Sequence, residues 1–238
     1  IHNYMFYYII QKIKKILWSK PEYRNLYWRF KHLIEPDWAK VYFDDRILND
    51  GRNRDKLIEF INQLNQKNIL EIGCASGANL FLLEEKKKYD HLEGIDISNY
   101  CIKEGKKILK RYNSNIVLKQ GNAIKPNYKN KSFDIVFISG VAFDLTDKDL
   151  FLAVTESLRI SKKYFILHIS NYKLHPSLNI KSKGVLYKSH FLRDYHLFFK
   201  ENFAKYSKKI IKLKKDTPEF GKEITYANLD YLIIIEIF

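Results

Sequence analysis

The 238-residue sequence is poor in cysteine and contains no long apolar run. Its two cysteines, Cys74 and Cys101, exclude a disulfide framework and lack metal-ligand spacing, so we expect a reducing, cytoplasmic compartment. No segment reaches the roughly 18 consecutive apolar residues that a membrane-spanning helix needs. No signal peptide with a small-residue cleavage site is recognisable either. The chain starts at Ile1 rather than at methionine, which leaves open whether its N-terminus is complete.

Arginine is scarce beside lysine, although the formal net charge is +15. A charge of this size suggests a nucleic-acid partner. Arginine, however, is the side chain whose planar fork best matches phosphate, so its scarcity weakens the case for RNA. Lysine is abundant together with asparagine, isoleucine and tyrosine, a mixture that an AT-rich coding sequence produces. We therefore favour a solvated basic surface, with an anionic substrate, a membrane surface and RNA as alternatives.

A hydrophobic content of 46% is enough for a packed core. Residues 1–50 are basic and rich in tyrosine and tryptophan, and we expect them to form a helical extension and cap. Within residues 4–18, apolar residues recur at helical spacing with lysines between them. Such a helix packs on its own domain or a partner, or lies on the anionic inner face of a membrane. Residues 51–238 are expected to form one domain.

Beyond residue 50, apolar segments of strand type and of helix type alternate, which predicts parallel βαβ units. Ser98 and Thr146 are good N-caps for two of the helices. The last two strands look like an antiparallel pair. We expect strands at residues 68–72, 91–95, 116–120, 133–139, 164–169, 208–214 and 228–238, and helices at residues 55–64, 78–87, 99–112, 147–160 and 194–202.

The segment 68–80 carries the most functional information. A short apolar strand runs into Glu71, and a turn of small residues, Gly73 to Gly77, then opens an apolar helix. This arrangement lets the backbone approach a ligand closely at the carboxyl edge of a parallel sheet. The two glycines stand four residues apart, which differs from the Gly-x-Gly-x-x-Gly pattern of dinucleotide-binding proteins and disfavours an NAD-dependent enzyme.

The pattern Glu-x-Gly-x-x-x-Gly resembles the first motif of class I S-adenosylmethionine (SAM) methyltransferases, and the segment 132–141 resembles the fourth-strand motif of that superfamily. The resemblance covers roughly residues 65–238. It implies an α/β fold with a Rossmann-like, seven-stranded, mostly parallel sheet, whose last strand is antiparallel and whose faces both carry helices. It also implies a lid over the acceptor at about residues 170–200. A further likeness, around residues 188–195, is to methylases associated with surface-glycan biosynthesis.

The resemblance assigns the cofactor SAM, with S-adenosylhomocysteine as its product. An acid at the end of the second strand, Asp96, would bind the ribose hydroxyls, and Asn122 would bind the adenine. Near the junction of the N-terminal extension and the domain, Tyr42 and Arg54 would either touch the methionine carboxylate or serve packing and surface charge. The other cofactor-binding residues implied are Glu71, Gly73, Cys74, Ala75, Gly77, Asn79, Ile97, Ala123, Ser139 and Gly140.

The candidates for binding the methyl acceptor and removing its proton are residues at or beyond the strand ends. Asp144 is expected to be a base, a ligand of an acceptor hydroxyl, or an acid at a helix N-terminus. His168 is a second catalytic candidate, although a lone histidine in an apolar strand is more often a core residue. Arg193 either holds a carboxylate or phosphate of the acceptor or pairs with its neighbour at a helix start. His190 and Tyr195 are also expected to bind substrate.

No metal site is expected, because the histidines lack ligand spacing. The sequence thus predicts a SAM-dependent methyltransferase that methylates a small-molecule or glycan-type hydroxyl by in-line transfer. The alternatives are an RNA or protein N-methyltransferase and a non-catalytic SAM-binding partner subunit. Nucleic acid is possible as a partner but not favoured, the N-terminal helix could contact an anionic membrane, and the oligomeric state stays open.

Overall fold

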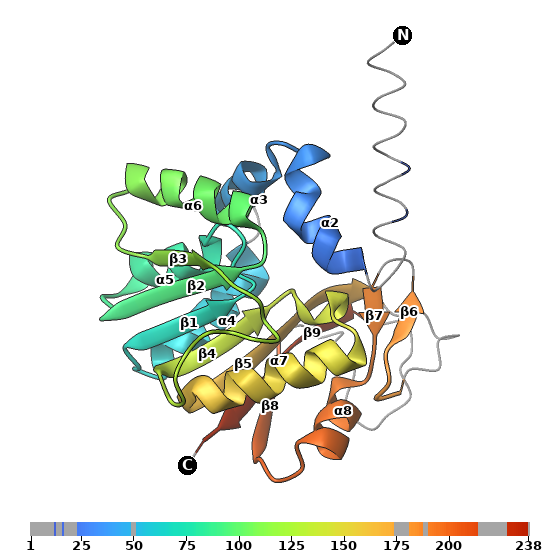
Figure 1. Ribbon diagram of the computed structural model, residues 1–238. Coiled ribbons are helices and arrows are strands. Elements are labelled where there is room, and N and C mark those ends of the chain that lie inside the picture. The colour runs from blue at the N-terminus through green and yellow to red at the C-terminus, as the bar shows by residue number, and fades with distance from the viewer. Residues whose placement is uncertain are drawn as a thin grey trace.

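The computed structural model describes residues 12, 16, 23–48, 51–173, 181–187, 190–213 and 228–237 (Figure 1). The expected leader helix at 4–18 therefore lies almost entirely outside the described residues, as do parts of the expected lid. The side chain of Arg54 is also outside them, although its backbone belongs to a helix. Membrane contact through the leader consequently stays a prediction.

A seven-stranded sheet forms the centre of the molecule, with the strand order β3-β2-β1-β4-β5-β9-β8 (Figure 1). Strands β1 to β5 pair in parallel, whereas β9 is antiparallel to both of its neighbours, as the sequence predicted. The strand bounds are β1 Asn68–Ile72, β2 His91–Asp96, β3 Val117–Gln120, β4 Phe133–Ser139, β5 Ser161–Lys173, β8 Lys208–Lys212 and β9 Asn228–Glu236.

Helices cover both faces of this sheet (Figure 1). The side chains of each central strand alternate between two apolar clusters, one under α7 and α8 and the other under α4, α5 and α6. The helix bounds are α2 Arg24–Phe30, η2 Lys31–Leu33, α3 Trp38–Leu48, α4 Gly51–Gln63, α5 Ala78–Lys86, α6 Asn99–Arg111, η3 Ala142–Asp144, α7 Asp147–Ile160 and α8 Tyr195–Asn202.

Local sequence signals predicted most of these boundaries. Strands β1 and β4 have the expected limits, and α7 begins where the side chain of Thr146 accepts a hydrogen bond from the Asp149 backbone amide at 3.1 Å. The oxygen of Ser98 likewise caps α6. Three features differ from expectation. Helix α4 begins at Gly51, earlier than predicted, and strand β5 is longer than predicted. A small hairpin, β6 Val185–Tyr187 with β7 His190–Leu192, lies within the segment that we expected to form the lid.

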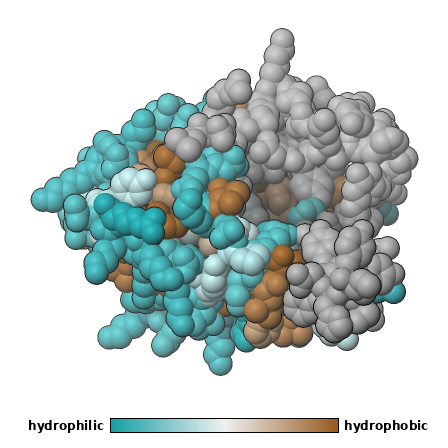
Figure 2. Space-filling model, turned by 90° about the horizontal axis from the view of Figure 1, so that it is seen from above, coloured by the Kyte–Doolittle hydropathy of each residue, from teal (hydrophilic) through white to brown (hydrophobic). Residues whose placement is uncertain are grey.

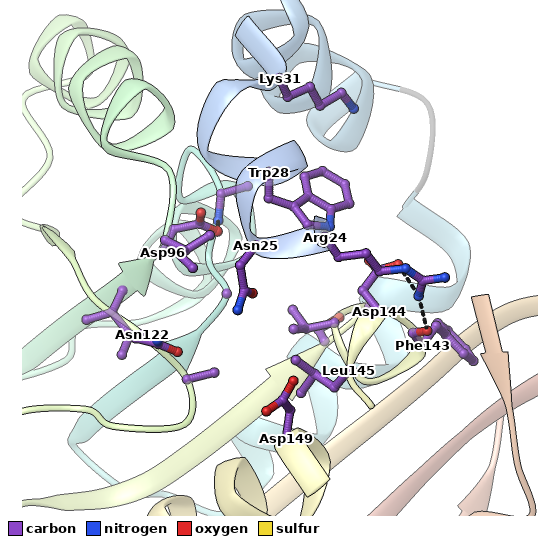
Figure 3. Close-up of a pocket in the computed structure, with 18 of the residues that line it drawn as sticks. Arg24, Asn25, Trp28, Lys31, Asp96, Asn122, Phe143, Asp144, Leu145 and Asp149 are labelled. Carbon is purple, nitrogen blue, oxygen red and sulfur yellow. Dashed lines mark hydrogen bonds and ion pairs between the residues drawn. The ribbon is translucent and has the colours of Figure 1, made fainter. Parts of the chain in front are cut away.

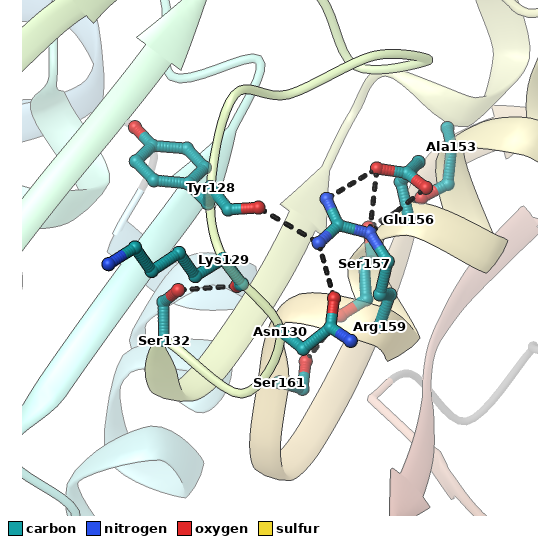
Figure 4. Close-up of polar contacts among 9 residues, drawn as sticks. All are labelled: Tyr128, Lys129, Asn130, Ser132, Ala153, Glu156, Ser157, Arg159 and Ser161. Atoms are coloured by element: carbon teal, nitrogen blue, oxygen red, sulfur yellow. Dashed lines mark hydrogen bonds and ion pairs between the residues drawn. The ribbon is translucent and has the colours of Figure 1, made fainter.

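Polar contacts hold the loop between β3 and β4 against α7 (Figure 4) and against β2. Arg159, near the end of α7, donates to the carbonyl of Tyr128 and to the side chain of Asn130, both at 2.8 Å. The Tyr128 hydroxyl in turn hydrogen-bonds the buried carboxylate of Glu93 on β2. These contacts keep the loop close to the sheet, and the residues that open the loop, beginning at Gly121, lie at the carboxyl end of β3.

The helices α2 and α3 lie above the carboxyl ends of β1 and β2 (Figure 1). The Ser76 hydroxyl in the turn after β1 donates to the Ala39 carbonyl of α3 at 2.9 Å, and Trp38 packs with Ala75 and Cys101. On the face that Figure 2 shows, the described residues are largely hydrophilic, with separate apolar patches. Within the described ranges, no helix combines the length and the apolar character needed to cross a bilayer.

Candidate active site

A cavity of about 480 Å³ lies at the carboxyl edge of the sheet, beneath α2 and α3 (Figure 3). Parallel sheets of this type bind ligands at this edge, where the strand order reverses between β1 and β4. The cavity is lined by Arg24, Asn25, Trp28, Lys31, Trp38, Tyr42, Gly73, Ala75, Ile95, Asp96, Ile97, Gly121, Asn122, Ala123, Ile124, Ser139, Gly140, Val141, Phe143, Asp144, Leu145, Asp149 and His190.

The turn after β1 forms one wall of this cavity through its backbone. Gly73 and Gly77 have φ angles of +77° and +90°, which only glycine adopts without strain. A Cβ on Gly73 would lie 2.2 Å from the Cγ2 atom of Val141, so this position also lacks room for a side chain. Ala75 has a φ of +50°, an unusual conformation for a residue with a side chain.

Asp96 ends β2 and holds this turn in place. One oxygen of its carboxylate accepts from the Ala75 amide at 2.9 Å, and the other accepts from the Ser98 amide at 2.8 Å. Burial raises the pKa of Asp96 above its ordinary value, although hydrogen bonds from the backbone oppose the rise. The carboxylate thus faces the cavity with lone pairs left for hydroxyl donors.

The loop after β3 forms the opposite wall. Asn122 lines the cavity, and its side-chain oxygen accepts from the Ile124 amide at 3.1 Å, which fixes the orientation of the amide group. Gly121 is pinned by a hydrogen bond from its amide to the Asp96 carbonyl at 2.9 Å. Ile95 and Ala123 also line the cavity, which makes the slot beside Asn122 partly apolar.

Several predicted cofactor residues lie beneath the turn and do not line the cavity. Glu71 is buried, and its carboxylate accepts from the Asn79 side chain at 2.5 Å. Cys74 is buried against Gly94, and burial raises the pKa of its thiol. Gly77 begins α5 as its N-cap residue. These residues lie behind the turn, whereas Gly73 and Ala75 of the same turn line the cavity.

Ser139 and Gly140 end β4 at the floor of the cavity. His168 is fully buried beside them on β5, and its Nδ1 atom lies 2.8 Å from the Ser139 hydroxyl. His168 does not line the cavity. The catalytic role that the sequence suggested for it would therefore be indirect, as through its contact with Ser139.

Asp144 and His190 meet at the other end of the cavity. Asp144 belongs to η3 and His190 begins β7, and the Nδ1 atom of His190 lies 3.0 Å from the Asp144 carboxylate. The Arg24 guanidinium lies 3.7 Å from the same carboxylate and donates to the Phe143 carbonyl at 3.3 Å (Figure 3). A carboxylate only accepts hydrogen bonds, so Nδ1 of His190 is the donor in this pair.

Arg193 does not line the cavity, which differs from the substrate contact predicted for it. Its buried guanidinium donates to the carbonyls of Ala142 and Leu145 at 3.0 and 2.8 Å and bonds Asp147. These bonds tie the hairpin to η3. The alternative, an ion pair between Arg193 and its neighbour Asp194 at the start of a helix, is not among these contacts. Asp194 instead caps α8 by accepting from the Leu197 amide.

Tyr195 is also buried away from the cavity, where it packs edge-on against Phe143 at 6.2 Å between ring centroids. Burial raises the pKa of its hydroxyl to about 12. Phe143 itself lines the cavity, so Tyr195 supports one of the walls from behind.

Sequence reasoning missed the contribution of α2 and η2 to the site. Asn25 and Trp28 of α2 and Lys31, the first residue of η2, line the cavity, and their spacing of three residues places them on one helical face. The Lys31 ammonium lies over the rings of Trp28 and Trp38, at 4.9 and 4.5 Å from their centroids. That spacing in the aromatic leader was the available signal. Tyr42, which was predicted, also lines the cavity.

No group of three or more metal-ligating side chains that could hold an ion occurs among the described residues.

The comparisons with known proteins agree with the fold. Residues 69–163 match the family model described as a methyltransferase domain. A search of curated proteins found no match to the sequence.

Solved structures that share the fold include methyltransferases. The PH0226 protein of Pyrococcus horikoshii OT3 is 21% identical with a TM-score of 0.60, covering 82% of this chain and 94% of that one. The methyltransferase domain of bacterial CtHen1 is 16% identical with a TM-score of 0.60, covering 79% and 99%. Magnesium protoporphyrin IX methyltransferase of Synechocystis PCC 6803, solved with bound SAM, is 11% identical with a TM-score of 0.56, covering 78% of each chain.

Proposed function

We propose that this chain, which carries a methyltransferase domain over residues 69–163, is a SAM-dependent methyltransferase acting on a hydroxyl group of a small molecule or glycan. The observation that carries the proposal is one cavity that is lined by the Asp96 carboxylate at one end and by the Asp144–His190 pair at the other. The first end suits a nucleoside, and the second suits an acceptor that must lose a proton.

The lining residues fit SAM group by group. Asp96 would accept from the ribose hydroxyls, and the slot beside Asn122 would take the adenine. The backbone at Gly73 and Gly140 leaves space for the methionine part, since neither residue carries a side chain. Trp38 of α3 also lines the cavity.

When bound, SAM supplies an activated methyl group on a positively charged sulfur. The protein then has to align the acceptor with that group, exclude water and remove a proton. Nε2 of His190 would take the hydroxyl proton, because Nδ1 is engaged by Asp144. The resulting positive ring is stabilised by the Asp144 carboxylate at 3.0 Å. Arg24 lies on the other side of Asp144, with its guanidinium 3.7 Å from the carboxylate.

Calorimetry tests the cofactor assignment. SAM and S-adenosylhomocysteine should bind to the wild-type protein, and NADH should not. The variant Asp96→Asn should bind S-adenosylhomocysteine about 10- to 100-fold more weakly, because it loses charged hydrogen bonds of about 1.5–3 kcal/mol. The matched control Asp90→Asn changes an exposed aspartate just before the same strand and should leave binding unchanged. Absence of binding by both SAM ligands to the wild type would overturn the proposal.

A second experiment tests the catalytic pair. His190→Ala and Asp144→Asn should keep the affinity for S-adenosylhomocysteine within about 3-fold, while methyl transfer falls by about 100-fold, in the range of general-base catalysis. A variant that loses cofactor binding and transfer together would place the pair in the cofactor site instead.

A further inference from the structure

The acceptor end of the cavity is built by four elements from three separate parts of the sequence. It comprises the lining residues that remain once the cofactor is placed as proposed. Asn25 comes from α2, Asp144 from η3, Asp149 from the first turn of α7, and His190 from β7. Trp28 and Phe143 add aromatic surface to the same cavity. This end is therefore rich in hydrogen-bonding groups that flank two aromatic rings.

The positive charges in the lining are already engaged by the protein. The Arg24 guanidinium is 2% exposed, bonds the Phe143 carbonyl and lies beside Asp144. The Lys31 ammonium lies over two tryptophan rings and is 3.4 Å from the Glu35 carboxylate. Neither cation is therefore available to a phosphate without breaking contacts that hold the cap in place.

The negative charges are not balanced in the same way. Asp144 has Arg24 and His190 as partners, whereas the Asp149 carboxylate makes no ion pair or side-chain hydrogen bond in the part of the chain that the structure describes. The backbone amide of Asp149 donates to the Thr146 side chain. Figure 3 shows Asp149 pointing into the cavity from below and Asn25 pointing into it from above. A phosphate or carboxylate on the acceptor would meet an uncompensated carboxylate here.

We infer that the acceptor is an uncharged molecule with several hydroxyl groups, of the carbohydrate class, and that Asp149 and Asn25 are its recognition residues. The inference rests on the proposed function and names its substrate class. Asp149 accepts hydrogen bonds from two hydroxyls, and Asn25 both donates and accepts. Trp28 and Phe143 cover the C–H face of the ring. A free hydroxyl then stands near His190, which takes its proton.

Saturation-transfer NMR tests the inference with weakly binding probes on protein loaded with S-adenosylhomocysteine. The probes are the methyl glycosides of glucose, galactose, mannose and rhamnose, and glucose 6-phosphate. At least one neutral glycoside should give a signal, and glucose 6-phosphate should give one at least 5-fold weaker. Asp149→Asn and Asn25→Ala should each reduce the glycoside signal at least 5-fold. The control Glu85→Gln, on the exposed face of α5, should not.

Asp149→Asn removes a charge from the first turn of α7 but keeps the Thr146 cap, so the variant should fold. Binding of S-adenosylhomocysteine, measured on each variant, separates the two hypotheses. If the wild type binds this ligand but no glycoside, or binds glucose 6-phosphate more strongly, the carbohydrate inference is wrong and the methyltransferase proposal stands. If the wild type does not bind the ligand, the proposed function itself fails.

Discussion

The two ends of the cavity are built in different ways. The cofactor end consists of turns that directly follow β1, β2, β3 and β4, so backbone geometry shapes most of it. The acceptor end consists of side chains brought together over long distances along the chain. Asp144 and His190 are 46 residues apart, and the Arg24 contact with Phe143 spans 119. A fold can therefore keep the first end constant and vary the second through few residues.

The largest effect should come from filling the turn of the cofactor end. Gly73→Ala forces an unfavourable φ and a contact of 2.2 Å with Val141, and together these should cost about 2–5 kcal/mol of unfolding free energy. Binding of S-adenosylhomocysteine should be lost as well. Gly140→Ala is the matched control, because its φ is +70° but no atom lies within 4 Å of the added Cβ.

Gly140→Ala should therefore cost only the backbone term of about 1–2 kcal/mol. Urea denaturation monitored by circular dichroism measures both variants. Equal losses would show that backbone strain alone limits this end and that the contact with Val141 is relieved by a small shift.

This difference also explains how much could be predicted from the sequence. The strand before Gly73, the cap at Ser98 and the acid at Asp96 are local signals, because each acts within a few residues of the chain. Their positions in the structure follow the sequence closely. The hairpin at residues 185–192 carries no comparable signal, since its register depends on pairing rather than on a distinctive turn.

Arg193 is a second case in which the local sequence did not predict the contacts of a residue. Its sequence neighbours suggested a ligand contact, whereas its partners, Ala142, Leu145 and Asp147, lie about 50 residues away. Local sequence could not reveal that bond. Asn25 was missed for a related reason, because only the packing of α2 over the sheet brings it to the cavity.

The next effect in size should come from Arg193, which holds the acceptor end together. Arg193→Met leaves the buried carbonyls of Ala142 and Leu145 without their donor, which should cost about 1–3 kcal/mol. Because η3 carries Asp144, methyl transfer should fall about 10-fold while the affinity for S-adenosylhomocysteine stays unchanged. Arg29→Met, on the exposed side of α2, is the control. An equal loss of cofactor affinity in Arg193→Met would show that the two ends are not independent.

A smaller effect is expected from pH at the cofactor end. Ribose hydroxyls donate to the ionised form of Asp96, so affinity for S-adenosylhomocysteine should fall as pH decreases through the pKa of this residue. Burial raises that pKa above 3.8, and the loss should therefore begin at a higher pH than for an ordinary aspartate. The free energy of unfolding of the ligand-free protein should instead increase as pH decreases through this pKa, because protonation removes a buried charge. Calorimetry measures the affinity for S-adenosylhomocysteine across pH on wild type and Asp96→Asn. The affinity of the variant should show no such decline, because it lacks the titrating carboxylate.

The smallest effect should come from Ala75, the one residue of the cofactor turn whose side chain opposes its backbone conformation. Its φ of +50° costs about 1–2 kcal/mol for alanine, and Ala75→Gly should recover about 0.5–1 kcal/mol after the entropy of glycine in the unfolded chain is subtracted. Affinity for S-adenosylhomocysteine should stay within about 2-fold, because the Ala75 amide still donates to Asp96. Lys131→Gly, at a φ of +52° on an exposed loop, relieves the same strain without touching the site. The Ala75 methyl group packs with Trp38 and Cys101, so a gain smaller than that of Lys131→Gly, measured by urea denaturation, would show that contact with the cap offsets the strain. A loss of stability in Ala75→Gly would mean that this contact outweighs the strain, and that the cofactor turn depends on side chains as the acceptor end does.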